Sequence, residues 1–333
     1  MNTNLRPTTI SNACDEYLTS IQLARSENTA RTYRNAMNAF CDVLSDHGYS
    51  PIEAITTDLP EDAVSWFTLS LKQYAPSTER LYLTAVTGYF EFLDAERMAA
   101  PNLSRLRRII HQRARKPGQR LPQFPREYIE ELIIYATNLA SLPTDKDIDY
   151  LRNLRDRAFL LVLADTGLRV HEACGMQRGD MDWNEGKAII TGKGDRQAVV
   201  RFSGRSINAL RDYLGARTKI DGTSGKPLAS LPLFARHDRG AGNKIKPITT
   251  TTGRNIVSQR VKEALGDNFT ERITPHSFRH YFVTTVLRAS GGNLKVAQEL
   301  ARHRNIAVTQ RYAHLSDDDL DHAYYEMFDA KTL

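Results

Sequence analysis

The chain has 333 residues, of which 41% are hydrophobic and 25% charged, and its formal net charge is +6. This length suits two domains that each bury a core, and the ordinary charge content argues against wholesale disorder. No uncharged apolar run approaches about 18 residues, so no membrane span is expected. The N-terminus lacks an apolar signal region, and Cys14, Cys41 and Cys174 are isolated, so neither secretion nor a disulfide framework or thiolate zinc site is indicated.

The first hundred residues have apolar positions at helical spacing behind polar cap residues, which predicts a helical domain over 8–103. A weak internal repeat relates 28–33 to 77–82 at a constant offset of 49 residues. Two similar helices, each opened by a Ser or Thr cap, explain this repeat. A helical hairpin that serves only as scaffold explains it equally well. Each copy continues through an alanine, an aromatic residue and a leucine: Ala36, Phe40 and Leu44, then Ala85, Tyr89 and Leu93.

The segment 104–126 contains eight basic residues and no Asp or Glu. Pro117, Gly118, Pro122 and Pro125 interrupt its second half, which predicts a helix end that runs into an extended interdomain linker. Clustered cations without counter-charges favour a polyanion, so we expect this linker to follow phosphates. A merely solvated linker is the alternative. The basic residues are Arg105, Arg107, Arg108, Arg113, Arg115, Lys116, Arg120 and Arg126.

A second domain is predicted over 127–315. Helices are expected at roughly 127–140 and 151–165, and Thr166-Gly167 ends the second of them. Alternating residues predict a small antiparallel hairpin with strands near 187–190 and 198–200 and a turn at 192–195. The rest again has helical patterning, with a loop rich in Gly, Lys and Thr around 221–252. The fold class is therefore mainly α, with an α+β second domain.

Phosphodiester exchange without a metal needs a nucleophile, positive charge on the phosphoryl oxygens and a proton for the leaving oxygen. Arg169 in an exposed turn suits the charge role, and Glu172 three residues later can orient its guanidinium or accept a proton. An ordinary capping ion pair explains these two residues as well. Lys193 in the Gly-containing hairpin turn can reach into a groove, although such lysines are usually only solvated.

Further candidates lie in two later segments. His276 and Arg279 are spaced i, i+3 behind the helix start Thr274-Pro275, so both face one side of a helix. His280 completes an HxxxH pair, but a metal site is disfavoured because the glutamate of HExxH is missing and Arg279 would repel a cation.

His303 and Tyr312 are nine residues apart across a predicted helix break, which allows Tyr312 to fold back beside His303. Taken alone, Tyr312 suits a packed core tyrosine. The order Arg, Lys, His-x-x-Arg, then His and Tyr, behind a basic linker and a helical domain, is far more specific than any of its parts.

This order resembles the tyrosine recombinases, the superfamily of phage integrase, Xer and Cre enzymes, over nearly the whole chain. The resemblance implies a helical, SAM-like core-binding domain before the linker and a catalytic domain with the DNA breaking-rejoining enzyme fold after it. It also implies a C-terminal helix over 316–333 that docks onto a neighbouring subunit; packing within the same subunit is the alternative.

By this resemblance, Arg169 and Arg279 clamp the scissile phosphate, and Tyr312 attacks it to form a 3′-phosphotyrosine bond. Lys193 protonates the leaving 5′ oxygen. Glu172 occupies the acidic position after the first arginine, where it helps to assemble the site.

The histidines complete this implied set: His276 acts as general acid/base and His303 hydrogen-bonds a phosphoryl oxygen. No cofactor, metal or ATP is expected, because the phosphotyrosine retains the bond energy for religation. Tyr324 and Tyr325 are rival nucleophiles, disfavoured because they lack the spacing to His303.

Two departures from the family pattern stand out. Arg302 precedes His303 where the family usually has glycine, which adds a potential phosphate contact. The hairpin continues Arg196-Gln197-Ala198, so the second basic position that often follows the turn is missing. Our candidate DNA contacts are Arg31, Arg80, Arg105, Arg107, Arg108, Arg113, Arg115, Lys116, Arg120, Arg196 and Arg302.

The resemblance implies site-specific recombination of double-stranded DNA through a Holliday junction. The expected partners are inverted-repeat core sites, a dimer on each site, a tetramer in the synapse and possible accessory proteins; the expected location is the cytoplasm, at the nucleoid. Alternatives are a type IB topoisomerase and a non-catalytic DNA-binding protein. The chain starts almost at once with the core-binding domain, which disfavours a lambda-type integrase and favours an Xer/Cre-like or mobile-element enzyme.

Overall fold

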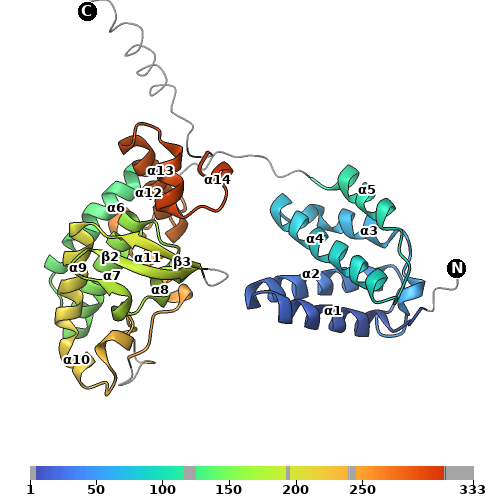
Figure 1. Ribbon diagram of the computed structural model, residues 1–333, viewed down its shortest axis with the longest axis horizontal. Helices are drawn as coiled ribbons and strands as arrows, with labels where there is room; N and C mark the ends of the chain where they lie inside the picture. Colours follow the sequence, from blue (N-terminus) through green and yellow to red (C-terminus); the bar gives the residue numbers. More distant parts are fainter. Residues whose placement is uncertain are drawn as a thin grey trace, which may run out of the picture. The chain divides into compact units, whose positions relative to one another are not determined.

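The computed structural model describes residues 5–115, 125–192, 196–238, 240, 245–310 and 312. The chain forms two compact units, Met1–Gln119 and Arg120–Leu333, which we call the N-terminal unit and, after the role that the resemblance implies, the catalytic unit. Figure 1 shows that the first is built from helices and that the second combines helices with a small sheet. Among the described residues, no helix is long and apolar enough to cross a membrane.

The N-terminal unit packs its helices around an aromatic core. Phe40 contacts Phe67 at 5.3 Å and Tyr89 at 6.3 Å between ring centroids, and all three rings are fully buried. Burial of such large rings stabilises the unit by roughly 2 kcal/mol or more per side chain. Its helices are α1 (Ile10–Ala24), α2 (Glu27–Asp46), α3 (Ala63–Ser70), α4 (Pro76–Ala95) and α5 (Leu103–Arg113), with short 3₁₀ turns at Thr56–Asp58 and Leu71–Gln73.

The internal repeat corresponds to α2 and α4, which pack against each other. Its alanine, aromatic and leucine positions are core positions in both helices, while Arg31 and Arg80 are exposed. Helix α2 begins after Ser26, as predicted. The predicted cap of the second helix is wrong, because α4 begins at Pro76 behind Ala75. Proline suits the first helical turn since it has no N–H to leave unpaired.

The basic segment has counter-charges that the local sequence does not reveal. Arg107 pairs with Glu91 at 2.6 Å, and Arg105 pairs with Glu61 and, at 3.4 Å, with Asp62. The interpretation of these arginines as uncompensated cations is therefore wrong, because their acidic partners lie outside the segment, on α4 and directly before α3. Arg108 and Arg113 are exposed, whereas Lys116 and Arg120 lie outside the described residues.

Arg115 anchors the end of α5 to the core of the unit. Its Nε donates to Glu79 at 2.5 Å and its Nη2 to the Tyr74 carbonyl at 2.5 Å. Glu79 is fully buried and also accepts from Lys72 Nζ at 2.7 Å. Arg115 is therefore a structural residue, and the first part of the predicted linker, up to this point, belongs to the N-terminal unit.

The catalytic unit is organised around α7 (Asp147–Thr166), which is buried along most of its length. Helices α6, α9 and α12 pack directly against it. The predicted helices at 127–140 and 151–165 are confirmed. The other helices are α6 (Arg126–Asn138), α8 (Val170–Gly175), α9 (Gly204–Ala216), α10 (Thr218–Gly222), α11 (Thr250–Leu265), α12 (Pro275–Ala289), α13 (Leu294–Ala301) and α14 (Ile306–Gln310), with 3₁₀ turns at Leu139–Ser141, Arg178–Asp180 and Leu228–Ser230.

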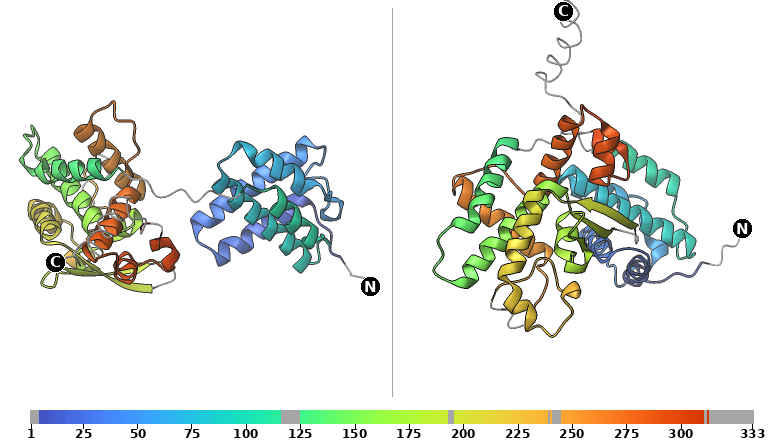
Figure 2. Two further views of the ribbon diagram at one scale, coloured as in Figure 1. Left: turned by 90° about the horizontal axis from the view of Figure 1, so that it is seen from above. Right: turned by 60° about the vertical axis from the view of Figure 1, so that its left-hand side comes forward.

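A three-stranded antiparallel sheet lies on one flank of these helices, as Figure 2 shows. It runs in the order β1 (Met181–Asp182), β2 (Lys187–Gly192) and β3 (Arg196–Arg201). The register pairs Ile189 with Val199, so Ala188, Ile190 and Val200 face the core on the other side. The hairpin and the mainly α fold class are confirmed; the two-residue strand β1 was not predicted.

Candidate active site

The turn between α7 and α8 positions the first arginine. Helix α7 ends at Gly167, whose φ of +58° is the left-handed conformation that glycine adopts without strain. Arg169 then precedes α8, and both oxygens of Glu172 bind it: Oε2 accepts from the backbone N–H and Oε1 from Nη1, each at 2.8 Å. The side chain of Arg169 remains 44% exposed, so Glu172 orients its guanidinium from the protein side while the guanidinium stays open to solvent.

Glu172 is held as a carboxylate in a buried position, with its side chain 5% exposed. Burial alone would raise its pKa, but the two hydrogen bonds from Arg169 and the charges of Arg302 and Arg169 outweigh burial, so the pKa is lowered. A carboxylate that is this firmly ionised and bonded at both oxygens orients Arg169 and is a poor proton acceptor at neutral pH.

Helix α12 positions the second arginine and two histidines. Thr274 caps the helix, with Ser277 Oγ accepting from the Thr274 N–H at 3.1 Å, and Pro275 fills the first turn as predicted. Arg279 is 2% exposed and donates from Nη1 to the Gly167 carbonyl at 2.5 Å and from Nη2 to the Ala301 carbonyl. Burial, followed by the charges of Arg169 and Arg302, lowers the pKa of Arg279 to about 10, so the guanidinium is still charged at neutral pH.

The histidines and Tyr312 form one aromatic cluster beside these arginines. His276 and His280 lie 4.3 Å apart between ring centroids, and His280 lies 4.9 Å from Tyr312. His303 stacks on the Tyr312 ring, with 6.1 Å between the ring centroids and an interplanar angle of 18°. The structure therefore brings together residues that are up to 36 positions apart in the sequence, from His276 to Tyr312.

His303 is fixed by Thr309, a residue that the sequence patterns did not single out. Its Nδ1 bonds the Thr309 hydroxyl at 2.8 Å, and its backbone N–H donates to the Gln298 carbonyl at 3.0 Å. Burial and the surrounding positive charges, Arg279 first, lower the pKa of His303 to about 4. The same causes lower the pKa of His276, and burial, His276 and Arg279 lower that of His280 to about 4. All three rings are therefore neutral at pH 7 in the absence of a bound anion.

Tyr312 follows α14 and its backbone N–H donates to the Thr309 carbonyl at 2.9 Å. Its ring is partly buried against a small apolar cluster that includes Val283, Leu287 and Ala301. The core-packing interpretation thus accounts for part of the surroundings of the ring, and His303 and His280 are its aromatic neighbours.

Several predicted positions are placed differently or not described. Arg302 is buried against the protein, with its side chain 10% exposed, so the structure does not present its guanidinium for the predicted phosphate contact. Arg196 opens β3 opposite Gly192, but Lys193 between them lies outside the described residues. The same holds for 316–333 with Tyr324 and Tyr325.

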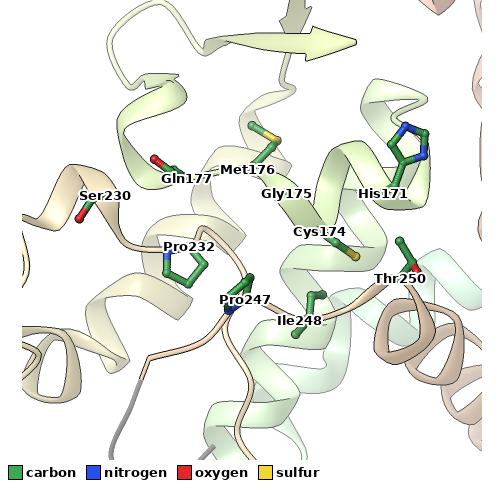
Figure 3. A pocket seen from close by; sticks show the side chains of 10 residues that line it. All are labelled: His171, Cys174, Gly175, Met176, Gln177, Ser230, Pro232, Pro247, Ile248 and Thr250. Carbon is green, nitrogen blue, oxygen red and sulfur yellow. The ribbon is translucent and has the colours of Figure 1, made fainter. Parts of the chain in front are cut away.

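A separate cavity of about 330 Å³ opens between α8 and the chain near 230–250 (Figure 3). Its lining is mostly apolar, and Cys174 is its one thiol. Burial raises the pKa of Cys174 to about 12, so this thiol is not a nucleophile at neutral pH. This cavity therefore offers no reactive thiol.

Comparison with known proteins identifies the class to which this fold and site belong. Residues 143–319 match the model of the phage integrase family, and residues 14–97 match that of the phage integrase N-terminal SAM-like domain. The chain therefore belongs to the phage integrase family, within the tyrosine recombinase superfamily of DNA-cleaving and rejoining enzymes. The match confirms the predicted family and the SAM-like fold of the first domain.

Similar proteins include the tyrosine recombinase XerC of Bacillus pumilus, 29% identical over 318 residues that cover 93% of this chain and 92% of the relative. XerC of Bacillus subtilis is 28% identical over 317 residues, with 93% and 92% covered. Among solved structures, the XerH recombinase bound to palindromic difH substrate has a TM-score of 0.66 and 17% identity, with 89% and 79% covered. The Tn1549 transposon integrase in complex with a circular intermediate DNA has a TM-score of 0.63 and 16% identity, with 95% and 99% covered, so both share the fold.

Proposed function

We propose that the chain is an Xer-type, site-specific recombinase that cuts DNA with Tyr312 through a 3′-phosphotyrosine intermediate. The observation that most directly supports this is the cluster in which His280 and His303 lie against the Tyr312 ring and His276 lies against His280. The charges of the buried Arg279 and the solvent-open Arg169 act on the same cluster. A free tyrosine has a pKa of about 10, so its attack at neutral pH requires proton removal or strong local positive charge. The arginines supply this charge.

Each group has a defined task in the proposed reaction. The guanidinium of Arg169 binds the non-bridging oxygens of the scissile phosphate. Arg279 adds positive charge through the N–H groups that do not bond the Gly167 and Ala301 carbonyls. Neutral His276 takes the phenolic proton as Tyr312 attacks phosphorus. His303, with Nδ1 committed to Thr309, presents its other nitrogen to a phosphoryl oxygen.

The attack breaks the P–O5′ bond, and Lys193 protonates the leaving oxygen. Rejoining reverses these steps with a 5′ hydroxyl from the partner strand. The phosphotyrosine ester conserves the bond energy, so the reaction uses neither ATP nor a metal ion. Glu172 stays ionised throughout and keeps Arg169 in place.

The relatives support a proposal for assembly on DNA. XerH was solved on a palindromic substrate, which supports an inverted-repeat core site with one subunit on each half. Two such sites give a tetramer that exchanges strands in pairs through a Holliday junction. The XerC relatives, which match over nearly their whole length, support an Xer-type recombinase. Exposed Arg31, Arg80, Arg108 and Arg113 are the contacts that we expect with phosphates in the N-terminal unit.

The test is covalent trapping on a library of nicked duplexes with randomised half-sites. The wild-type protein should enrich one inverted-repeat sequence as a covalent complex, and Tyr312→Phe should form none while binding the same DNA. Tyr281→Phe, in the same unit, is the matched control and should trap DNA normally. A Tyr312→Phe protein that still forms covalent complexes would contradict the nucleophile. Trapping without sequence preference, together with relaxation of supercoiled plasmids that lack the site, would instead indicate a topoisomerase.

A further inference from the structure

Arg302 adopts a backbone conformation that arginine disfavours. It ends α13 with φ of +57°, and among the described residues Arg97 is the only other non-glycine residue with positive φ. The family usually has glycine at this position, and glycine adopts the left-handed region without strain. An arginine at such a position needs compensation from its side chain, and such outliers gather at functional sites.

The Arg302 side chain turns inward and joins the end of α13 to the turn between α7 and α8. Its Nη1 donates to the carbonyls of Leu300 at 3.3 Å and Thr166 at 3.5 Å, and its Nη2 to the Gly167 carbonyl at 3.4 Å. Nη2 also lies 3.4 Å from Glu172 Oε2. These contacts are long, so each is weak alone, but together they hold a buried guanidinium against the carboxylate that orients the first catalytic arginine.

The two oxygens of the Glu172 carboxylate have different numbers of hydrogen-bond donors. Arg169 and Arg302 both approach Glu172, and each favours its ionised form. Oε2 receives two donors, the Arg169 backbone N–H and Arg302, while Oε1 receives the Arg169 guanidinium. Removal of Arg302 leaves Oε2 with one donor in a buried site, so the pKa of Glu172 rises. Glu172 then holds the Arg169 guanidinium less firmly in place.

We propose that Arg302 is a positioning residue that, in place of the usual glycine, fixes Glu172 and through it the phosphate-binding guanidinium of Arg169. This role rests on the proposed recombinase function. In this role Arg302 does not contact DNA. Its loss slows the cleavage step and not DNA binding, because it displaces the Arg169 guanidinium that binds the scissile phosphate.

Arg302→Gly is the informative variant, because glycine suits the φ of +57° while the guanidinium and its contacts to Glu172 and the neighbouring carbonyls are removed. At saturating nicked site DNA, we expect its single-turnover cleavage to fall about 10- to 100-fold. Its thermal midpoint should be unchanged or higher, since the backbone strain is relieved. The salt dependence of DNA binding should stay the same, whereas loss of a phosphate contact would reduce the slope by about 1. Arg302→Lys, which restores the charge, should recover part of the rate.

Two further measurements separate positioning from general damage. The acidic limb of the rate profile should move to higher pH in Arg302→Gly, because the pKa of Glu172 is no longer held down by that charge. Glu172→Gln should cost much less in the Arg302→Gly background than in the wild type, since both changes disturb one unit. Arg97→Gly, which relieves the same strain in the N-terminal unit, is the matched control and should cleave normally.

Wild-type cleavage rates for Arg302→Gly, in a protein that does trap DNA, would overturn the inference. A reduced salt slope with unchanged saturated cleavage would also overturn it, because Arg302 would then bind phosphate directly. Failure of the wild type to trap any DNA would count against the proposed function instead.

Discussion

Gly167 is the position where a single added methyl group should disturb the catalytic unit most clearly. Its φ is +58°, and a Cβ atom there would lie 2.4 Å from Cδ1 and 2.9 Å from Cγ of Phe282. The left-handed conformation costs an alanine about 1–2 kcal/mol, and overpacking against a ring adds about 1–3 kcal/mol. We therefore predict that Gly167→Ala lowers the free energy of unfolding of this unit by roughly 2–5 kcal/mol.

The same substitution should also reduce activity, because the Gly167 carbonyl accepts hydrogen bonds from Arg279 and Arg302. A shift of this carbonyl by a fraction of an ångström moves Arg279 relative to the phosphate. Displacements of about 1 Å typically cost about 100-fold in rate. For this smaller shift, we expect single-turnover cleavage of site DNA to fall by roughly 10-fold in the variant that remains folded.

Urea unfolding followed by tryptophan fluorescence measures the effect on stability. The chain has two tryptophans, Trp66 in the N-terminal unit and Trp183 in the catalytic unit. In a Trp66→Phe background, Trp183 therefore reports on the catalytic unit alone. Gly175→Ala is the control, because nothing lies within 4 Å of a Cβ there and its φ is not positive.

Phe282→Ala separates the two contributions. Combined with Gly167→Ala, it removes the steric contact but leaves the backbone strain, so the double variant should lose less than the sum of the single changes. If Gly167→Ala and Gly175→Ala unfold at the same urea concentration, the proposed strain and contact at Gly167 do not exist in solution.

Two other predictions concern buried charge. Glu79→Gln should lower the stability of the N-terminal unit by about 2 kcal/mol, because Lys72 and Arg115 lose a charged acceptor; unfolding followed by Trp66 in a Trp183→Phe background measures this, and an unchanged midpoint would refute it. The second concerns pH: His237 and His303 have pKa values of about 3 and about 4 in the fold, against an ordinary value of 6.5. Because the folded-state pKa values are depressed, the stability is fully present above pH 6.5 and is lost as pH falls, by about 2 kcal/mol per histidine at pH 5. Urea titrations at pH 7.5 and 5 check this, and His303→Gln should remove about a third of the difference, because His280 also has a pKa of about 4 in the fold; an equal pH dependence in that variant would exclude His303 as a source.

Much of the fold follows from local sequence signals. Gly167 ends α7, Thr274-Pro275 begins α12 and the alternation over 187–200 forms the hairpin, since each depends on neighbouring residues only. The cap of α4 was missed because the helix starts keep the repeat offset, at Glu27 and Pro76, but the position that corresponds to the cap residue Ser26 is Ala75. Strand β1 is two residues long and has no periodicity to detect.

Long-range partners account for what the sequence did not reveal. Arg105, Arg107 and Arg115 read as free cations because their acidic partners lie 16 to 44 positions away. The catalytic candidates were found through their order along the chain, which the family resemblance makes specific. That order gives no information on which backbone carbonyls hold Arg279, or that Thr309 fixes the His303 ring, because those contacts exist only after α12, α13 and α14 have packed.

The most direct test of the account is the identity of the residue that carries DNA. Wild-type protein trapped on the selected nicked site can be digested with protease and nuclease, and the peptide that retains a nucleotide sequenced by mass spectrometry. We predict a single modified peptide with the nucleotide on Tyr312, joined through a 3′ phosphate. Modification of Tyr324 or Tyr325 instead, or a linkage through a 5′ phosphate, would contradict the proposed mechanism.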